Sequence, residues 1–203
     1  KETRADLHER FAAWLEGTAR ERTSDIDEIL GYHLEQAFRY RRELGPIDEA
    51  GRRLATRAGE RLAAAGRRAL ARGDARAASS LLTRATSLVP QETPGREDLL
   101  VQLGGALVIA GEFPRAEAAL GEAVETSAAA GNRRTELHAL LERSFLHALT
   151  DPVGGGPELR RATEQPAAPW HLVEAAGPRA RNIAIAETLL AQFRTHLRVQ
   201  ASR

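Results

Sequence analysis

The chain has 203 residues, of which 42% are hydrophobic and 28% charged, and its formal net charge is +1. This composition is ordinary for a globular protein long enough to bury a core, and the balanced charge gives no general attraction to nucleic acid or to an anionic membrane. Cysteine is absent, which excludes disulfides and thiolate metal sites and fits a cytoplasmic protein. The longest apolar run, Leu103–Gly111, is about half of the roughly 20 residues that a membrane span needs, so no membrane association is expected.

The first two predicted helices form the N-terminal part of the chain. Apolar residues recur at helical spacing over about Arg4–Ala19, where Trp14 is predicted to anchor the core rather than to stack on a ligand. The residues of this stripe are Leu7, Phe11, Trp14 and Leu15. A second helix is predicted to begin with Ser24 as its N-cap and to end at Gly45-Pro46. Its apolar stripe consists of Ile26, Ile29, Leu30, Leu34, Ala37, Phe38 and Leu44.

The next four predicted helices contain an internal repeat. They are expected over Ile47–Ala71, Arg76–Val89, Arg96–Ala110 and Pro114–Ala130. The stretch Leu62–Pro90 is similar to Leu100–Ala123 in the same register, with 38 residues from Leu62 to Leu100, against the roughly 34 of a tetratricopeptide repeat. The matching positions are Leu62, Ala65, Gly66, Ala69, Gly73, Ala78, Leu82 and Ala85 in the first copy, and Leu100, Leu103, Gly104, Leu107, Gly111, Ala116, Leu120 and Ala123 in the second.

The small residues of the repeat predict how each hairpin packs. Gly66 and Gly104 are expected to let the second helix of their hairpin approach closely, with Ala78 and Ala116 filling the gap. Gly73 and Gly111 are expected to end the first helices in a left-handed conformation.

The repeat does not continue faithfully beyond the second copy. A helix is predicted over Thr135–Leu149, with Leu137, Leu140, Leu141 and Phe145 as its apolar residues, and Gly131-Asn132 is predicted as the turn before it. Residues 150–178 are rich in glycine and proline and allow only a short helix, Glu158–Glu164. A last helix is predicted over Pro178–Val199, with Ile183, Ala186, Leu190, Phe193 and Leu197 on one side.

These patterns predict an all-α protein, a tetratricopeptide-like α-α superhelix of stacked helical hairpins. The predicted organisation is an N-terminal helical hairpin over residues 1–45, repeats over 46–150, and an irregular loop with a C-terminal helix over 151–203. Because the chain begins without Met and inside an apparent helix, we expect it to be part of a larger protein.

No catalytic, cofactor-binding or metal-binding residue is predicted. The sequence has no phosphate-binding loop of the G-x-x-x-x-G-K-[ST] type and no H-E-x-x-H zinc motif, and its six histidines include no pair at helical spacing. His33 beside Glu35 is the only pair that suggests general base chemistry, and we interpret it as a histidine on a helix flank. The arginines of the chain middle are either a polyanion-binding stripe or a solvated helix face, and the second interpretation is favoured. They are Arg52, Arg53, Arg57, Arg61, Arg67, Arg68, Arg72 and Arg76.

The predicted site is therefore a surface on the first helix of each repeat, opposite its packing side. Val101, Val108 and Ile109 are aliphatic where a solvated helix should be polar, so we expect an exposed patch that a partner segment, a neighbouring domain or a second subunit covers. The candidate residues are Glu60, Ala63, Arg67 and Leu70 with the neighbouring Ala71 in the first copy, and Asp98, Val101, Gly105, Val108 and Ile109 in the second.

The segments RADLHERFAAWLE, residues 4–16, and DEILGYHLEQAFRYRRELG with its continuation to Asp74 carry a resemblance to a known family. They resemble the helical region that follows the ATPase module in large bacterial signalling proteins, the STAND-type ATPases with adenylate/guanylate cyclase or LuxR-type output domains. The likeness covers about residues 4–150 and is most specific over Glu28–Gly45.

The resemblance implies a non-catalytic protein-interaction and sensor module, with the ATPase and the cyclase or DNA-binding output elsewhere in the protein. The partner would be a protein or a neighbouring domain of the same chain, nucleic acid would be reached only through another domain, and a homodimer stays open. The alternative is the inducer-binding region of a LuxR-type transcriptional activator, which would bind a small molecule at the same predicted surface. A free-standing enzyme is the third and most distant interpretation.

Overall fold

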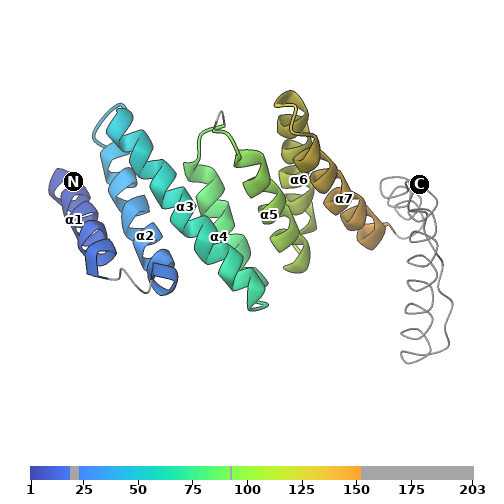
Figure 1. The fold of residues 1–203 in the computed structure, drawn as a ribbon, viewed down its shortest axis with the longest axis horizontal. Coiled ribbons are helices and arrows are strands. Elements are labelled where there is room, and N and C mark those ends of the chain that lie inside the picture. The colour runs from blue at the N-terminus through green and yellow to red at the C-terminus, as the bar shows by residue number, and fades with distance from the viewer. Residues whose placement is uncertain (19–22, 92, 152–203) are drawn as a thin grey trace, which may run out of the picture. The chain divides into compact units, whose positions relative to one another are not determined.

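The structure is a computed structural model that describes residues 1–18, 23–91 and 93–151. The chain divides into two compact units, residues 1–162 and 163–203, and every described residue lies in the first unit. The described residues form seven α-helices and no strand, and each helix packs against the next along the chain (Figure 1). They are α1 Glu2–Thr18, α2 Thr23–Arg42, α3 Glu49–Ala71, α4 Ala75–Leu88, α5 Arg96–Ile109, α6 Phe113–Ala129 and α7 Arg133–Thr150. The predicted all-α fold of stacked helical hairpins is confirmed.

The tight turns inside the hairpins are made by glycine. Gly73 and Gly111 follow α3 and α5 with φ angles of 79° and 77°, the left-handed region that glycine adopts without a steric penalty. In each turn the next residue donates its N–H back into the helix, from Asp74 to the Ala69 carbonyl and from Glu112 to the Leu107 carbonyl, both at 2.9 Å. These are Schellman ends, which satisfy carbonyls that the helix leaves free. The predicted left-handed ends are confirmed.

The hairpins share one packing register. A Cβ added to Gly66 would meet Leu82 at 2.8 Å, and one added to Gly104 would meet Leu120 at 2.5 Å, so both glycines permit the predicted close approach. The gap is filled by these leucines, one turn beyond Ala78 and Ala116, which corrects the predicted filling by alanine. The leucines sit in a spacing of i, i+4, i+7 whose members are essentially fully buried: Leu30, Leu34 and Ala37 in α2, Ala78, Leu82 and Ala85 in α4, and Ala116, Leu120 and Ala123 in α6.

That common spacing makes α1 and α2 a hairpin of the same kind as the two repeats. The three hairpins are α1–α2, α3–α4 and α5–α6, and α7 follows α6. Because α2 packs directly on α3, the N-terminal hairpin joins the repeats in one continuous stack. The predicted division of the chain into residues 1–45, 46–150 and 151–203 stays a prediction.

Helix α1 buries a different face from the predicted one. Its buried residues are Ala5 and Ala12, while Leu7 and Trp14 are 57% and 59% exposed, so the prediction that Trp14 anchors the core is wrong. Small residues face α2 here because the two helices lie close together, and the large side chains fall on the outer side.

Two details of α2 also differ from the prediction. The helix begins at Thr23, so Ser24 lies inside its first turn and is not the N-cap. Leu30, Leu34 and Ala37 are buried as predicted, whereas Ile29 and Leu44 are exposed. Ile29 lies on the outer side of the helix, and Leu44 lies beyond its end at Arg42.

Helix α7 packs on both α5 and α6, and three of the four residues predicted as its apolar stripe are exposed, while Leu140 is half-buried. Its buried apolar residues are Ala139 and Leu146, whereas Leu137, Leu141 and Phe145 are exposed. The predicted helices Glu158–Glu164 and Pro178–Val199, and residues 152–203 of the predicted C-terminal part, lie outside the described residues.

None of the described helices combines the length and the apolar composition needed to cross a membrane.

Candidate functional site

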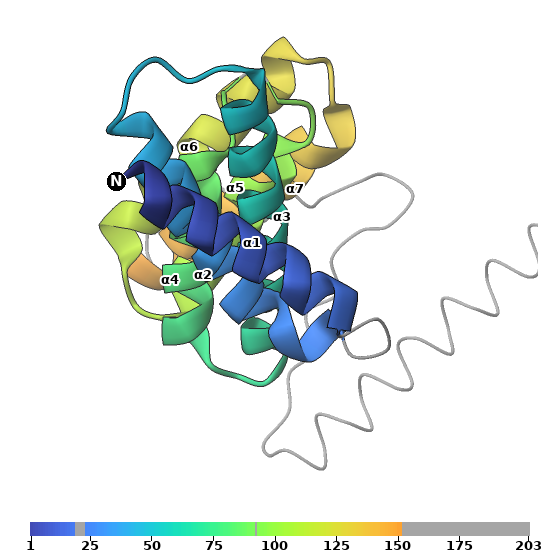
Figure 2. The ribbon, with the colours of Figure 1, turned by 90° about the vertical axis from the view of Figure 1, so that its left-hand side faces the viewer.

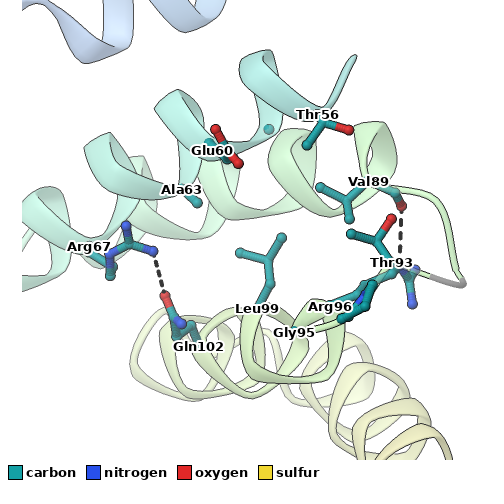
Figure 3. A pocket seen from close by; sticks show the side chains of 12 residues that line it. Thr56, Glu60, Ala63, Arg67, Val89, Thr93, Gly95, Arg96, Leu99 and Gln102 are labelled. Carbon is teal, nitrogen blue, oxygen red and sulfur yellow. Dashed lines mark hydrogen bonds between the residues drawn. The ribbon is translucent and has the colours of Figure 1, made fainter. Parts of the chain in front are cut away.

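The candidate site is a groove between α3 and α5, closed at one end by the segment that joins α4 to α5 (Figure 3). Helix α3 contributes a stripe of four side chains at helical spacing, Thr56, Glu60, Ala63 and Arg67. Leu99 and Gln102 come from α5, and Val89, Thr93, Pro94, Gly95 and Arg96 come from the connection and the start of α5. The groove has a volume of about 220 Å³.

Local sequence explains why the groove has this shape. Gly59 lets the end of α4 approach α3, since a Cβ there would lie 2.8 Å from a methyl group of Val89. Gly95 takes a φ of 85° immediately before α5, a conformation that favours glycine and turns the chain into the helix. The connection therefore folds tightly against the groove's end.

Polar contacts hold the two walls together. The Arg67 guanidinium donates to the Gln102 side-chain oxygen at 3.3 Å, across the groove. Arg96, whose side chain is largely buried, donates to the Val89 carbonyl at 3.3 Å and is ion-paired with Glu122. Glu60 makes no ion pair with any described residue. The groove thus has an apolar floor at Ala63 and Leu99 and a free carboxylate on its rim.

Three of the six arginines of α3 form ion pairs with acidic residues of the N-terminal hairpin. Asp27 of α2, only 5% exposed, accepts from Arg61 at 3.0 Å and Arg68 at 2.7 Å. Glu16 of α1 pairs with Arg57 at 2.7 Å and with Arg61 at 3.1 Å. These three arginines are therefore complementary in charge to the neighbouring helices, which reduces the support for a polyanion-binding stripe.

The structure brings three of the ten candidate residues together in the groove, Glu60, Ala63 and Arg67. Glu60 and Arg67 are exposed and Ala63 is buried beneath them. Leu70 is half-buried against the core, and Ile109 stands alone at 66% exposure on another side of α5.

The expected exposure of Val101 and Val108 is wrong, because both side chains are buried. The cause is α7, which packs on α5 and is tied to it by polar contacts. Thr135 donates to Asp98 at 2.6 Å, and Asn132 donates to Glu97 at 3.0 Å, a hydrogen bond that lowers the pKa of the Glu97 carboxyl. Gly105 belongs to the same covered side, with the Glu142 carboxylate of α7 at 3.8 Å from where its Cβ would lie.

Sequence reasoning missed Thr56 and the residues that α5 and the segment before it contribute to the groove. Thr56 could have been found, because it continues the spacing of Glu60, Ala63 and Arg67 by one turn. No sequence pattern marks Gln102 or Thr93, because their positions depend on how the segment between α4 and α5 folds.

Two histidines that are remote in sequence also meet. The Nδ1 atoms of His8 in α1 and His33 in α2 are 2.8 Å apart, a distance that requires one ring to donate and the other to accept. Burial lowers the pKa of both rings, and for His33 the neighbouring His8 lowers the pKa further. Among the residues that the structure describes, no three histidine, aspartate or glutamate side chains are grouped so that they could hold a metal ion.

An all-helical fold of stacked hairpins fits a non-enzymatic module. Comparisons with protein-family models, with curated proteins and with solved structures find no match to this chain.

Proposed function

We propose that this chain is a non-catalytic protein-interaction module that binds a partner segment in the groove between α3 and α5. The observation that carries the proposal is the groove itself, in which Glu60 and Arg67 stand on the rim above the apolar Ala63 and Leu99. A peptide or helix can bury apolar side chains on that floor and pair its own polar groups with the two rim charges.

We further propose that the module has a regulatory role in a bacterial signalling protein. This part rests on the resemblance of about residues 4–150 to the helical region of STAND-type ATPases. In such an arrangement, partner binding on the hairpins would bias an ATPase switch that lies in another domain.

The alternative, an inducer-binding region of a LuxR-type activator, is less well supported. Pockets that enclose small molecules usually have a volume of roughly 300–1,000 Å³. The groove has about 220 Å³ and is open to solvent, so it suits one or two side chains of a partner better than a whole inducer.

The test is selection of peptides from a displayed library against the protein, followed by mapping of the bound peptide by amide chemical shifts. We expect the shifts to cluster at Thr56, Glu60, Arg67 and Gln102. Arg67→Glu should weaken binding by about tenfold or more, because it reverses one of the two rim charges. Arg53→Glu is the matched control, since Arg53 is exposed on the same helix and does not line the groove.

Two outcomes would count against the proposal. Selected peptides that bind equally well to the Arg67→Glu protein would place the interaction elsewhere. Saturable binding of a nucleotide or candidate inducer in calorimetry, weakened by Arg67→Glu and with no peptide selected, would favour the inducer-binding alternative.

A further inference from the structure

A second surface lies at the N-terminal end of the described stack, on α1 and α2, and it differs in composition from the other described helices. We call it the aromatic face and define it by Leu7, Phe11 and Trp14 of α1 and Ile29 and Tyr32 of α2, all of which are exposed. In Figure 2 helix α1 lies in front of the other helices, so its outer side is not covered by any of them. An exposed apolar surface of this kind marks a site of interaction.

The aromatic composition of this face is unusual for the chain. The whole sequence has nine phenylalanine, tryptophan and tyrosine residues, and five of them fall in the α1–α2 hairpin. The hairpin cores elsewhere are built mainly from alanine and leucine. The rings form a connected group, with Phe11 5.6 Å from Trp14 and 4.4 Å from His33, and Tyr32 5.3 Å from His33, between ring centroids. Aromatic side chains are enriched at protein interfaces because they bury much area at low entropic cost.

The register of the stack indicates what covers such a face. Gly66 of α3 and Gly104 of α5 are buried against a leucine of their own hairpin, and we take the fully buried Ala12 as the corresponding residue of α1. Leu7, Phe11 and Trp14 lie at positions −5, −1 and +2 relative to Ala12. The same offsets reach Arg61, Ala65 and Arg68 in α3, and Leu99, Leu103 and Ala106 in α5.

In the two later hairpins this side meets the second helix of the preceding hairpin. On α3, Arg61 and Arg68 hold Asp27 of α2 while Ala65 is buried. On α5, which packs against α4, the three positions are all buried. In α1 alone among these three helices the corresponding positions are exposed.

We propose that the aromatic face binds an amphipathic α-helix of a partner protein, which packs on α1 in the manner that α2 packs on α3. The partner helix carries an aliphatic stripe with the spacing of Leu30, Leu34 and Ala37, the residues that α2 buries in the stack. The interaction continues the helix-on-helix packing already established along the chain, and it is separate from the groove between α3 and α5.

Charge adds a second requirement for the partner helix. Arg4 lies about one turn before Leu7 on α1, with its guanidinium 5.9 Å from the Tyr40 ring centre. It makes no ion pair with any described residue. An aspartate or glutamate beside the aliphatic stripe would pair with Arg4 as Asp27 pairs with the arginines of α3.

The test uses a synthetic stapled helix of about 20 residues with two L-x-x-x-L-x-x-A units and a glutamate beside the stripe. In a Trp170→Phe protein, Trp14 is the remaining tryptophan, so its emission reports on the face directly. We expect a saturable blue shift, because the exposed indole becomes covered. Phe11→Ser should weaken binding by about tenfold or more, as expected for an aromatic residue at the centre of an interface.

Matched controls make the result specific. Ile109→Ser removes another exposed apolar side chain, on helix α5, and should leave peptide binding unchanged. A peptide of the same composition with its leucines on opposite sides should not bind, and replacing its glutamate by lysine in the active peptide should weaken binding. Thermal unfolding of Phe11→Ser should stay cooperative with a midpoint well above the assay temperature, which separates a loss of binding from a loss of the fold.

The proposal is overturned if no blue shift occurs, or if Phe11→Ser and Ile109→Ser bind the peptide alike. It is also overturned if sedimentation shows that the protein alone is a dimer that Phe11→Ser dissociates, because the occupant is then a second copy of the chain.

Discussion

Helices α3 and α5 occupy equivalent places in successive hairpins, yet their outer sides differ. Both have a glycine against a leucine of their own hairpin, Gly66 against Leu82 and Gly104 against Leu120. The side of α3 that carries Glu60 and Arg67 is open as a groove, whereas the corresponding side of α5 is covered by α7. The comparison teaches that exposure in this stack is decided by the neighbouring helix and not by a helix's own pattern.

The strongest test of this contrast is a pair of substitutions at adjacent positions of α5. Val108→Glu places a carboxylate in the core under α7 and should abolish cooperative unfolding or destabilise the protein by about 4 kcal/mol or more. Ile109→Glu should change the free energy of unfolding by no more than about 0.5 kcal/mol, because Ile109 is exposed. Urea denaturation of both variants measures the difference. Equal stability of the two variants would mean that α7 does not cover α5.

The next test asks whether the two hairpins are equivalent inside. Leu82→Ala and Leu120→Ala each remove a fully buried side chain that packs against a glycine, and each should cost about 2–5 kcal/mol. The two losses should be similar, because the residues hold the same register. Thermal and urea unfolding give the values. A cost below about 1 kcal/mol for either would show that its hairpin is packed more loosely than the other.

A smaller effect is expected where α2 meets α3. Asp27→Asn removes the carboxylate that bridges Arg61 and Arg68 and should cost about 1–3 kcal/mol, because hydrogen bonds to charged groups are lost while both arginines keep part of their solvent. Glu49→Gln is the control, because Glu49 pairs with arginines in an exposed setting and should cost about 0.5 kcal/mol or less. Similar losses in urea denaturation would show that burial adds nothing to the Asp27 bridge.

The smallest effect concerns the His8–His33 pair, which has no counterpart in the later hairpins. Both rings have a pKa below the ordinary 6.5, so the unfolded chain takes up protons at a higher pH than the folded protein does. Stability from this source is complete above pH 6.5 and declines as the pH falls below that value.

Urea midpoints at pH 7.5 and 5.5 measure this decline. Substituting His8→Gln should reduce the difference between the two midpoints, and substituting the exposed His138→Gln should not. A difference that persists unchanged in His8→Gln would assign the pH dependence to other groups.

The local parts of the fold could be predicted because their causes are local. The ends of α3 and α5 follow from Gly73 and Gly111, and the close helix approach follows from Gly66 and Gly104. The burial of Val101 and Val108 could not be predicted, since it depends on Asn132 and Thr135 anchoring a helix some 30 residues further along.

The same reasoning explains the error at Trp14. An apolar stripe on a helix indicates a side that is suited to burial, but no described helix covers the side of α1 that carries Trp14. His8 and His33 are 25 residues apart, so no spacing rule for a single helix could have paired them. Their meeting follows from the way α1 packs on α2.

The matching turns at Gly73 and Gly111 have a consequence for how the array can change length. Both turns have the same left-handed glycine followed by an acidic residue that donates its N–H back into the helix. A recombination that joined Gly73 to Glu112 would remove 38 residues and put α3 directly before α6, with Gly66 facing Leu120 in an unchanged register. Lineages of such proteins could therefore gain or lose one hairpin at a time while each junction kept an intact helix end.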